Sequence, residues 1–293
     1  MELRVLRYFL TVAREESISA AAEALHITQP TLSRQLMELE AELGVKLFLR
    51  GKRNRRVILT EEGMLLRQRA EEISELAAKT EAELNAKDKI ISGDIYIGSG
   101  ETDAMRLIAR LAKELQKDYP HIRLHLYSGN ADDVTEKLDK GLLDFGLLIE
   151  PTDIEKYDYI KISATDSWGL LLGQDSPLAK QSVITASDLE GLPLLVSRQA
   201  LINNELSGWL GHNFANLNIV ATYNLIYNAA LMVDEGLGYA LCLDKLINTI
   251  GSNNLCFRPL EPRLEARLVI VWKKYQVFSK AAAKFRAKLQ DFL

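Results

Sequence analysis

Near the amino terminus, hydrophobic residues recur at helical spacing in three segments separated by polar residues. The first segment predicts an amphipathic helix, with apolar positions at Leu3, Leu6, Phe9, Leu10 and Val12 or Ala13. The second is rich in alanine and ends near Leu25, and Ser19 can cap its start. His26 and Ile27 make a turn, after which Thr28 can cap a third helix with Pro30 in its first turn. The apolar stripe of this third helix is Leu32, Leu36 and Leu39.

The opposite face of the third helix is polar, with Gln29, Thr31, Ser33, Arg34 and Glu38. In protein–DNA complexes Gln pairs with adenine and Arg with guanine, while Ser and Thr contact bases or phosphates. Residues 17–39 therefore predict a helix-turn-helix whose last helix reads DNA. An ordinary antiparallel helix pair with a solvated face fits the same stretch, and the flanking sequence decides between the two.

A basic hairpin is predicted soon after the third helix. Leu47 and Phe48 begin one strand and residues 57–59 form the other, with Gly51 and Asn54 as turn residues. A recognition helix followed by a cationic hairpin is typical of a winged helix-turn-helix. We therefore expect DNA contacts from Ser19, Thr28, Gln29, Pro30, Thr31, Ser33, Arg34, Arg50, Lys52, Arg53, Arg55 and Arg56.

These residues resemble the DNA-binding domain of the LysR-type transcriptional regulators. The resemblance is carried by Phe9, Ala13, residues 19–25, the run ITQPTLSRQLMELEAELGVKLFLR and the motif LTEEG that ends at Gly63. The hairpin departs from the family's pattern because it is slightly longer and more basic. The resemblance implies a regulator that binds double-stranded DNA and a small-molecule effector, as a homodimer and then a homotetramer. RNA polymerase would be a further partner if the protein is an activator.

Charge is distributed unevenly along the chain, whose net charge is −4 over 293 residues. Residues 1–60 hold ten Lys or Arg and seven Asp or Glu, a net charge of +3, so the remaining residues carry −7. An acidic body with a basic tip directs that tip toward phosphates.

Two cysteines, Cys242 and Cys256, lie in apolar surroundings, which favours buried reduced thiols over a redox switch. The start MELRVLRYFL has no secretory pattern, and no apolar run approaches the length of a membrane span. We therefore expect a cytoplasmic protein that does not enter a membrane.

Residues 61–89 predict one long helix, with apolar positions at Leu66, Ile73, Leu76 or Ala77, and Leu84. A lone helix of this length would expose that seam, so pairing with a second copy is favoured. Packing of the helix on its own domain is the alternative.

Beyond Ser92 and Gly93 the pattern alternates between strand and helix, which predicts a mostly parallel sheet with helices on both faces. DYPHIRLHLYSG, LDKGLLDFGLLI and VDEGLGYALC resemble the family's effector-binding domain, which is similar to a type 2 periplasmic binding protein. We expect an α/β multidomain fold with these parts: a winged helix-turn-helix at 1–60, a linker helix at 61–89, and a two-lobed domain at 93–293. Lobe I would comprise 93–162 and 265–293, and lobe II 163–264.

Ligands of α/β sheets bind at the carboxyl ends of strands, and two such lobes form a cleft. The predicted effector-binding residues are Ser99, Gly100, Glu101, Thr102, Ser128, Gly129, Glu150, Ser197, Arg198, Gln199, Tyr223 and Asn224. Arg198 could bind a carboxylate, whereas Glu101 and Glu150 would repel a purely anionic ligand. This combination suggests a ligand with a cationic or hydroxyl-rich part, unless both glutamates face solvent or pair with neighbouring cations. Trp168 and Trp272 are expected in the core.

The sequence offers little for catalysis. The four histidines, His26, His121, His125 and His212, are scattered, and neither a P-loop nor a nucleophile-elbow motif occurs. We expect no enzyme, metal or cofactor. A small-molecule-binding module with weak or vestigial DNA binding remains the alternative, and it would lack the steep salt dependence that the basic hairpin predicts.

Overall fold

The computed structural model describes residues 1–50, 57–85, 91–202, 204–211, 216–249 and 254–292. The chain divides into two compact units, Met1–Ala86 and Lys87–Leu293, and each is described by itself.

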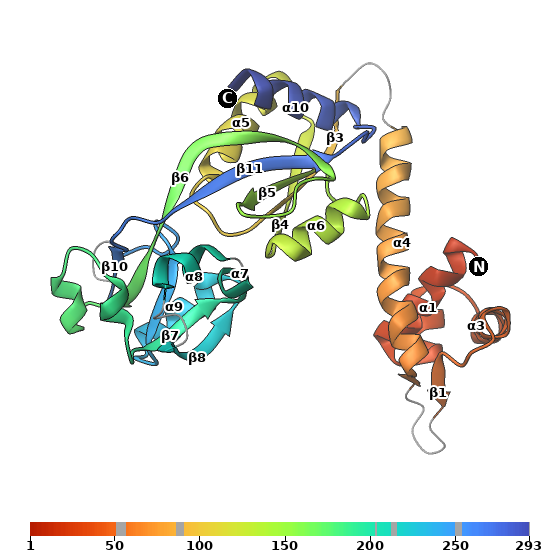
Figure 1. Ribbon diagram of the computed structural model, residues 1–293. Coiled ribbons are helices and arrows are strands. Elements are labelled where there is room, and N and C mark those ends of the chain that lie inside the picture. The colour runs from red at the N-terminus through yellow and green to blue at the C-terminus, as the bar shows by residue number, and fades with distance from the viewer. Residues whose placement is uncertain (51–56, 86–90, 203, 212–215, 250–253, 293) are drawn as a thin grey trace. The chain divides into compact units, whose positions relative to one another are not determined.

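The first unit is a helical domain with a two-stranded wing (Figure 1). Its elements are α1 (Leu3–Glu15), α2 (Ile18–Ala24), α3 (Gln29–Leu43), β1 (Phe48–Arg50), β2 (Val57–Leu59) and α4 (Glu61–Asn85). The predicted stripe of Leu32, Leu36 and Leu39 is buried against Phe9 of α1. The strands β1 and β2 pair antiparallel, which confirms the predicted hairpin.

The helix caps correct one prediction and confirm another. Ser17, not Ser19, caps α2, because its side chain accepts a hydrogen bond from the N–H of Ala20. Ser19 lies exposed within the first turn, two residues past the cap. Thr28 caps α3 as predicted, and the turn before it contains His26 in the left-handed region, at φ 54°.

The second unit contains a nine-stranded sheet and its covering helices. Its strands are β3 (Gly93–Ser99), β4 (Ile122–Ser128), β5 (Phe145–Ile149), β6 (Tyr157–Gly173), β7 (Pro193–Ser197), β8 (Asn218–Tyr223), β9 (Tyr239–Leu243), β10 (Leu255–Pro259) and β11 (Glu265–Lys273). Its helices are α5 (Met105–Asp118), α6 (Ala131–Asp139), η1 (Pro177–Lys180), η2 (Ala186–Leu189), α7 (Arg198–Ile202), α8 (Asn204–Leu210), α9 (Ile226–Asp234) and α10 (Lys280–Phe292).

The sheet is mixed rather than mostly parallel. The strand order is β4-β3-β5-β11-β6-β9-β7-β8, with β10 paired to β6. The strands β3, β4 and β5 run parallel, as do β7, β8 and β9, whereas β6, β10 and β11 form antiparallel pairs. The chain leaves the first lobe along β6 and returns along β11, so these two neighbours must run in opposite directions (Figure 1).

The strand β6 has 17 residues and belongs to both lobes. Its first part pairs with β11, and its last part pairs with β9 and β10. The pairing with β11 shifts register between Arg267 and Leu268, beside the predicted crossover near Ile162. The strand β10 was not predicted, because its sequence LCFRP is short and contains a proline.

Each lobe has helices on both faces of its part of the sheet. In the first lobe α5 and α10 cover one face and α6 covers the other. In the second lobe α7 and α8 pack on one face and α9 on the other. Trp168 and Trp272 are buried, as predicted.

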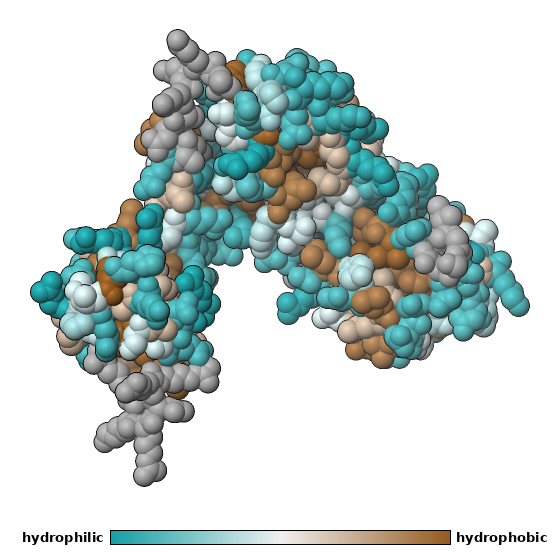
Figure 2. Space-filling view, turned by 180° about the vertical axis from the view of Figure 1, so that it is seen from behind, coloured by the Kyte–Doolittle hydropathy of each residue, from teal (hydrophilic) through white to brown (hydrophobic). Residues whose placement is uncertain are grey.

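Apolar side chains also reach the surface of the second unit, as the brown areas of Figure 2 illustrate. Those on β8, α9 and the turn after α9 are Ile219, Val220, Tyr227, Leu231, Met232 and Leu237. Among the described residues, no helix is long and apolar enough to cross a membrane.

Candidate DNA-binding surface and effector cleft

The polar face of α3 is available for contact. Gln29, Pro30, Thr31 and Arg34 are exposed and Ser33 is half-buried. The buried leucines of the same helix fix this face outward. Arg34 lies 3.7 Å from Glu38, an exposed pair that a DNA phosphate or base could displace at little cost.

Glu40 of α3 connects this helix to the wing. Its Oε1 accepts hydrogen bonds from the N–H groups of Leu47, at 2.8 Å, and Phe48, at 3.4 Å. Its Oε2 pairs with Lys46 at 2.9 Å. Burial raises the pKa of this carboxyl, but Lys46 and the two N–H groups outweigh burial and leave the pKa below its usual value. The wing is therefore positioned by the recognition helix itself.

The tip of the wing lies outside the described residues. Lys52, Arg53, Arg55 and Arg56 belong to that stretch, and the side chain of Arg50 is not described either. The strands that carry this basic segment are described on both sides of it.

In the second unit, a small cavity of about 60 Å³ lies between the two lobes. Seven predicted residues line it, namely Gly100, Glu101, Gly129, Ser197, Gln199, Tyr223 and Asn224. Two hydrogen bonds cross between the lobes here. Glu101 of the first lobe accepts from the N–H of Ile226 at the start of α9, and Gln199 of the second lobe accepts from the N–H of Ala131 at the start of α6, at 3.2 Å.

Burial governs the titration of the groups around this cavity. It raises the pKa of Glu101, although the hydrogen bond from Ile226 acts in the opposite direction. Burial and the nearby Cys242 and Glu101 raise the pKa of Tyr223 well above its usual value. The phenol of Tyr223 donates to the carbonyl of Leu241 at 2.6 Å, so it stays protonated and structural.

The other five predicted effector residues do not line this cavity. The buried Ser99 donates to the carbonyl of Gly100 at 2.6 Å, and the buried Thr102 donates to Asp166 on β6. Ser128 and Arg198 are exposed, and Glu150 is half-buried beside the β11 pairing. Thr102 and Asp166 instead join the two lobes close to the β6 crossing.

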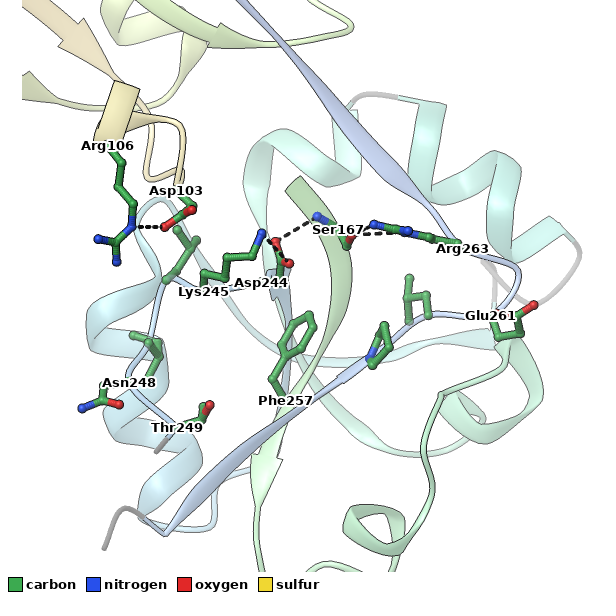
Figure 3. A pocket seen from close by; sticks show the side chains of 14 residues that line it. Asp103, Arg106, Ser167, Asp244, Lys245, Asn248, Thr249, Phe257, Glu261 and Arg263 are labelled. Carbon is green, nitrogen blue, oxygen red and sulfur yellow. Dashed lines mark hydrogen bonds and ion pairs between the residues drawn. The ribbon is translucent and has the colours of Figure 1, made fainter. Parts of the chain in front are cut away.

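A larger cavity of about 960 Å³ shares one lining residue, Leu246, with the small one. Charged residues from both lobes surround it, with Asp103 and Arg106 on one side and Asp244, Lys245 and Arg263 on the other (Figure 3). The cations are already paired: Arg106 with Asp103 at 2.7 Å, Lys245 with Asp244 at 3.1 Å, and Arg263 with Glu265 at 3.2 Å. The volume of this cavity is sufficient for a small organic molecule.

Comparison with known proteins finds a family model for each part of the chain. The family model described as "Bacterial regulatory helix-turn-helix protein, lysR family" matches residues 3–64, and "LysR substrate binding domain" matches residues 90–293. The chain belongs to the LysR family of transcriptional regulators. It is 31% identical to the Hca operon transcriptional activator HcaR of Escherichia coli, over all of this chain and 96% of that protein.

Further similarities cover the whole LysR-family chain. It is 28% identical to the uncharacterized HTH-type transcriptional regulator YvbU of Bacillus subtilis, over 97% of this chain and 96% of that protein. It has the fold of full-length CbnR bound to its target DNA, with a TM-score of 0.76, 21% identity and complete coverage of both chains. Full-length BenM matches with a TM-score of 0.56 and 24% identity, over 100% of this chain and 97% of that one. These findings confirm the predicted fold class and a regulator rather than an enzyme.

The cysteines of this LysR-family regulator are free and buried, as predicted. Burial raises the pKa of Cys242 to about 12 and also raises that of Cys256. A protonated thiol is a poor nucleophile, so neither cysteine is suited to react with an oxidant.

Sequence reasoning missed the charged residues of the larger cavity. Asp244 and Lys245 directly follow β9, so the rule that ligands bind at the carboxyl ends of strands would have found them. Arg263 and Phe257 come from the segments around β10, which the pattern did not predict as a strand.

Proposed function

We propose that the exposed face of α3 reads base edges in the major groove of an operator, while the basic wing contacts phosphates. The observation that carries this proposal is the polar face of Gln29, Thr31 and Arg34, held outward by the buried stripe on the other side of α3. Such residues form the usual hydrogen bonds to adenine and guanine. Thr28 caps α3, Pro30 and Ser33 belong to α3, and Ser19 is an exposed residue of α2, so we expect these remaining predicted residues to contribute contacts as well.

The regulator acts as a homo-oligomer in this proposal. On α4 the apolar residues Leu65, Ile73, Leu76 and Leu84 are 59%, 36%, 41% and 82% exposed, and they fall within about 100° on one side of the helix. The predicted seam residue Leu66 instead packs into the core of its own unit. A second copy of α4 would bury this stripe, and the apolar surface of β8 and α9 supports further association into a homotetramer.

A small molecule bound in the cleft would alter the arrangement of the two lobes and so the spacing of the recognition helices. Its effect on DNA affinity must be matched by an equal effect of DNA on its own affinity. The hydrogen bonds of Glu101 and Gln199 support this role for the cleft, since both cross between the lobes and both side chains line the small cavity. Regulation of transcription is expected in the cytoplasm, with RNA polymerase as partner if the protein activates.

Selection of binding sites from random duplex DNA tests the proposal. The full-length protein should enrich a dyad-symmetric motif, because two recognition helices address two half-sites. Arg34→Ala should lose information at the positions it reads, whereas Arg55→Ala should weaken binding to all sequences about equally. Failure to enrich any motif at moderate salt, with and without cell metabolites, would contradict the proposal.

A further inference from the structure

The helix α9 lacks a cap of its own, and the opposite lobe supplies one. Its N-cap residue is Leu225, whose side chain has no acceptor, and no acidic residue lies in its first turn. The amino-terminal end of a helix has free N–H groups and partial positive charge, so it attracts anions. Glu101 fills that position by accepting a hydrogen bond from Ile226. The place where this cleft would bind a ligand carboxylate is therefore occupied.

The Glu101 carboxylate retains unused acceptor capacity. Among the described residues, no Lys or Arg pairs with it, and the N–H of Ile226 is the one donor assigned to it. A carboxylate accepts about four hydrogen bonds. Glu101 also lines the inter-lobe cavity, so a ligand there would find an acceptor with negative character on one wall.

Trp168, a second residue that lines this cavity, has an unused hydrogen-bond donor. It lies at the start of the second-lobe part of β6, is 8% exposed and lines the cavity, as Tyr223 and Asn224 do. Its indole Nε1 is buried and has no hydrogen-bond partner within the described part of the chain. A buried unpaired donor costs about 1–3 kcal/mol, which a ligand that accepts its hydrogen bond would recover.

We propose that Glu101 and Trp168 together select the end of the effector that enters the inner cavity. They favour an uncharged group that both donates and accepts hydrogen bonds, such as a carboxamide or a hydroxyl, and they reject a carboxylate. This inference rests on the proposed function, because it concerns the ligand of the same cleft. A carboxylate would satisfy Trp168 but would meet Glu101 with no cation between them.

The size of the cavity suits such a group. A volume of about 60 Å³ holds about two water molecules, since each occupies about 30 Å³ in the liquid. The inner cavity therefore takes one small polar group, while the remainder of the effector extends past Leu246 into the larger cavity.

Acetamide and acetate test the proposal because they share one shape and differ in charge and in the ability to donate. Each is titrated into the full-length protein at constant ionic strength, and the indole N–H resonance of Trp168 is followed by NMR. The resonance is assigned by its loss in Trp168→Phe. Acetamide should shift this signal saturably in the wild-type protein, and acetate should bind at least about tenfold more weakly.

Glu101→Gln is the informative variant because its amide oxygen can still cap α9. In this variant the preference for acetamide over acetate should fall by about tenfold or more, since the charge that repels acetate is gone. Trp168→Phe should weaken acetamide binding by about two- to tenfold, as judged from the acetamide methyl signal. The matched control is Glu155→Gln, an exposed carboxylate of the same lobe, which should behave as wild type.

Equal affinities for acetamide and acetate in the wild-type protein would overturn the proposal, as would an unmoved Trp168 signal. An unchanged preference for acetamide over acetate in Glu101→Gln would show that Glu101 does not select the ligand. Operator binding is measured on the same samples by fluorescence anisotropy. Loss of operator binding with normal acetamide binding would contradict the proposed function alone, and the reverse result would contradict this inference alone.

Discussion

The carboxylate of Glu40 and the backbone N–H of Leu47 lie 2.8 Å apart, joining the recognition helix to the residue that precedes the first strand of the wing. Glu40 is 8% exposed, so water does not replace this contact when it is lost. The same carboxylate neutralises Lys46. One side chain therefore links the two elements that are expected to touch DNA.

Glu40→Ala should destabilise the first unit by about 1–3 kcal/mol, because it leaves the buried N–H of Leu47 without a partner. Hydrogen exchange of the amides of residues 46–49 should accelerate accordingly in the full-length protein. Glu75→Ala, which removes an exposed carboxylate of α4, is the control and should leave these amides protected. Unchanged protection in Glu40→Ala would show that the wing holds its place without this contact.

The same contact predicts a dependence on pH. The pKa of Glu40 is below its usual 4.5 in the folded protein, so its stabilising effect is present above about pH 4.5 and is lost as the pH falls through the folded value. The stability difference between wild type and Glu40→Gln should therefore shrink on acidification. Hydrogen exchange at several pH values, corrected for intrinsic rates, measures it. A difference that is constant down to about pH 3 would contradict the assignment.

The first unit could be predicted from sequence because its signals are local. Thr28, Pro30 and the leucine stripe fix α3 through caps and periodicity within a few residues of each other. The Ser19 error has a local cause too, since Ser17 and Ser19 are both good caps and only the backbone conformation decides. The role of Glu40 could not be predicted from the sequence pattern, because its hydrogen-bond partners come from the start of the wing and meet it only in the folded domain.

The cleft was harder to predict because it is built from distant segments. The strand-end rule found Glu101, Gln199 and Tyr223, which the structure brings together from both lobes. It could not show that Glu101 caps α9, since that contact joins residues 125 positions apart. The sequence pattern placed Trp168 in the core but could not show that this residue also lines the cavity, because burial and ligand contact give the same apolar pattern.

Gly63→Ala should destabilise the first unit strongly. A Cβ at this position would lie 2.2 Å from the carbonyl oxygen of Leu47, so α4 and the backbone just before β1 would have to separate. Overpacking of this kind costs about 1–3 kcal/mol. Far-UV circular dichroism during thermal unfolding, together with operator binding, measures the effect. Gly208→Ala is the control, since it meets open space in a helix and should not lower stability. Normal stability of Gly63→Ala would show that α4 can shift freely.

Ile73→Glu combined with Leu76→Glu should separate the subunits. Each buried Ile or Leu contributes about 1.5–3 kcal/mol, so two changes in each of two chains should raise the dissociation constant at least about a thousandfold. Sedimentation velocity measures the species present. Glu75→Lys, at an exposed position of α4 outside the stripe, changes charge without altering an apolar residue of the stripe and should leave association intact. An unchanged sedimentation coefficient in the double variant would place the interface elsewhere.

Glu101 predicts a pH dependence opposite to that of Glu40. Burial holds its pKa above the usual 4.5 in the folded protein, so ionisation at this site costs stability. Its contribution is fully present below about pH 4.5 and is lost as the pH rises through the folded value. Relative to Glu101→Gln, the wild type should therefore lose stability as the pH rises above about 4.5 and then level off. Urea unfolding followed by tryptophan fluorescence measures this, since all three tryptophans, Trp168, Trp209 and Trp272, lie in the second unit. The stability difference between wild type and Glu155→Gln should stay constant over the same pH range. If the wild type instead gains stability over Glu101→Gln as the pH rises, the hydrogen bond from Ile226 outweighs burial and the prediction is wrong.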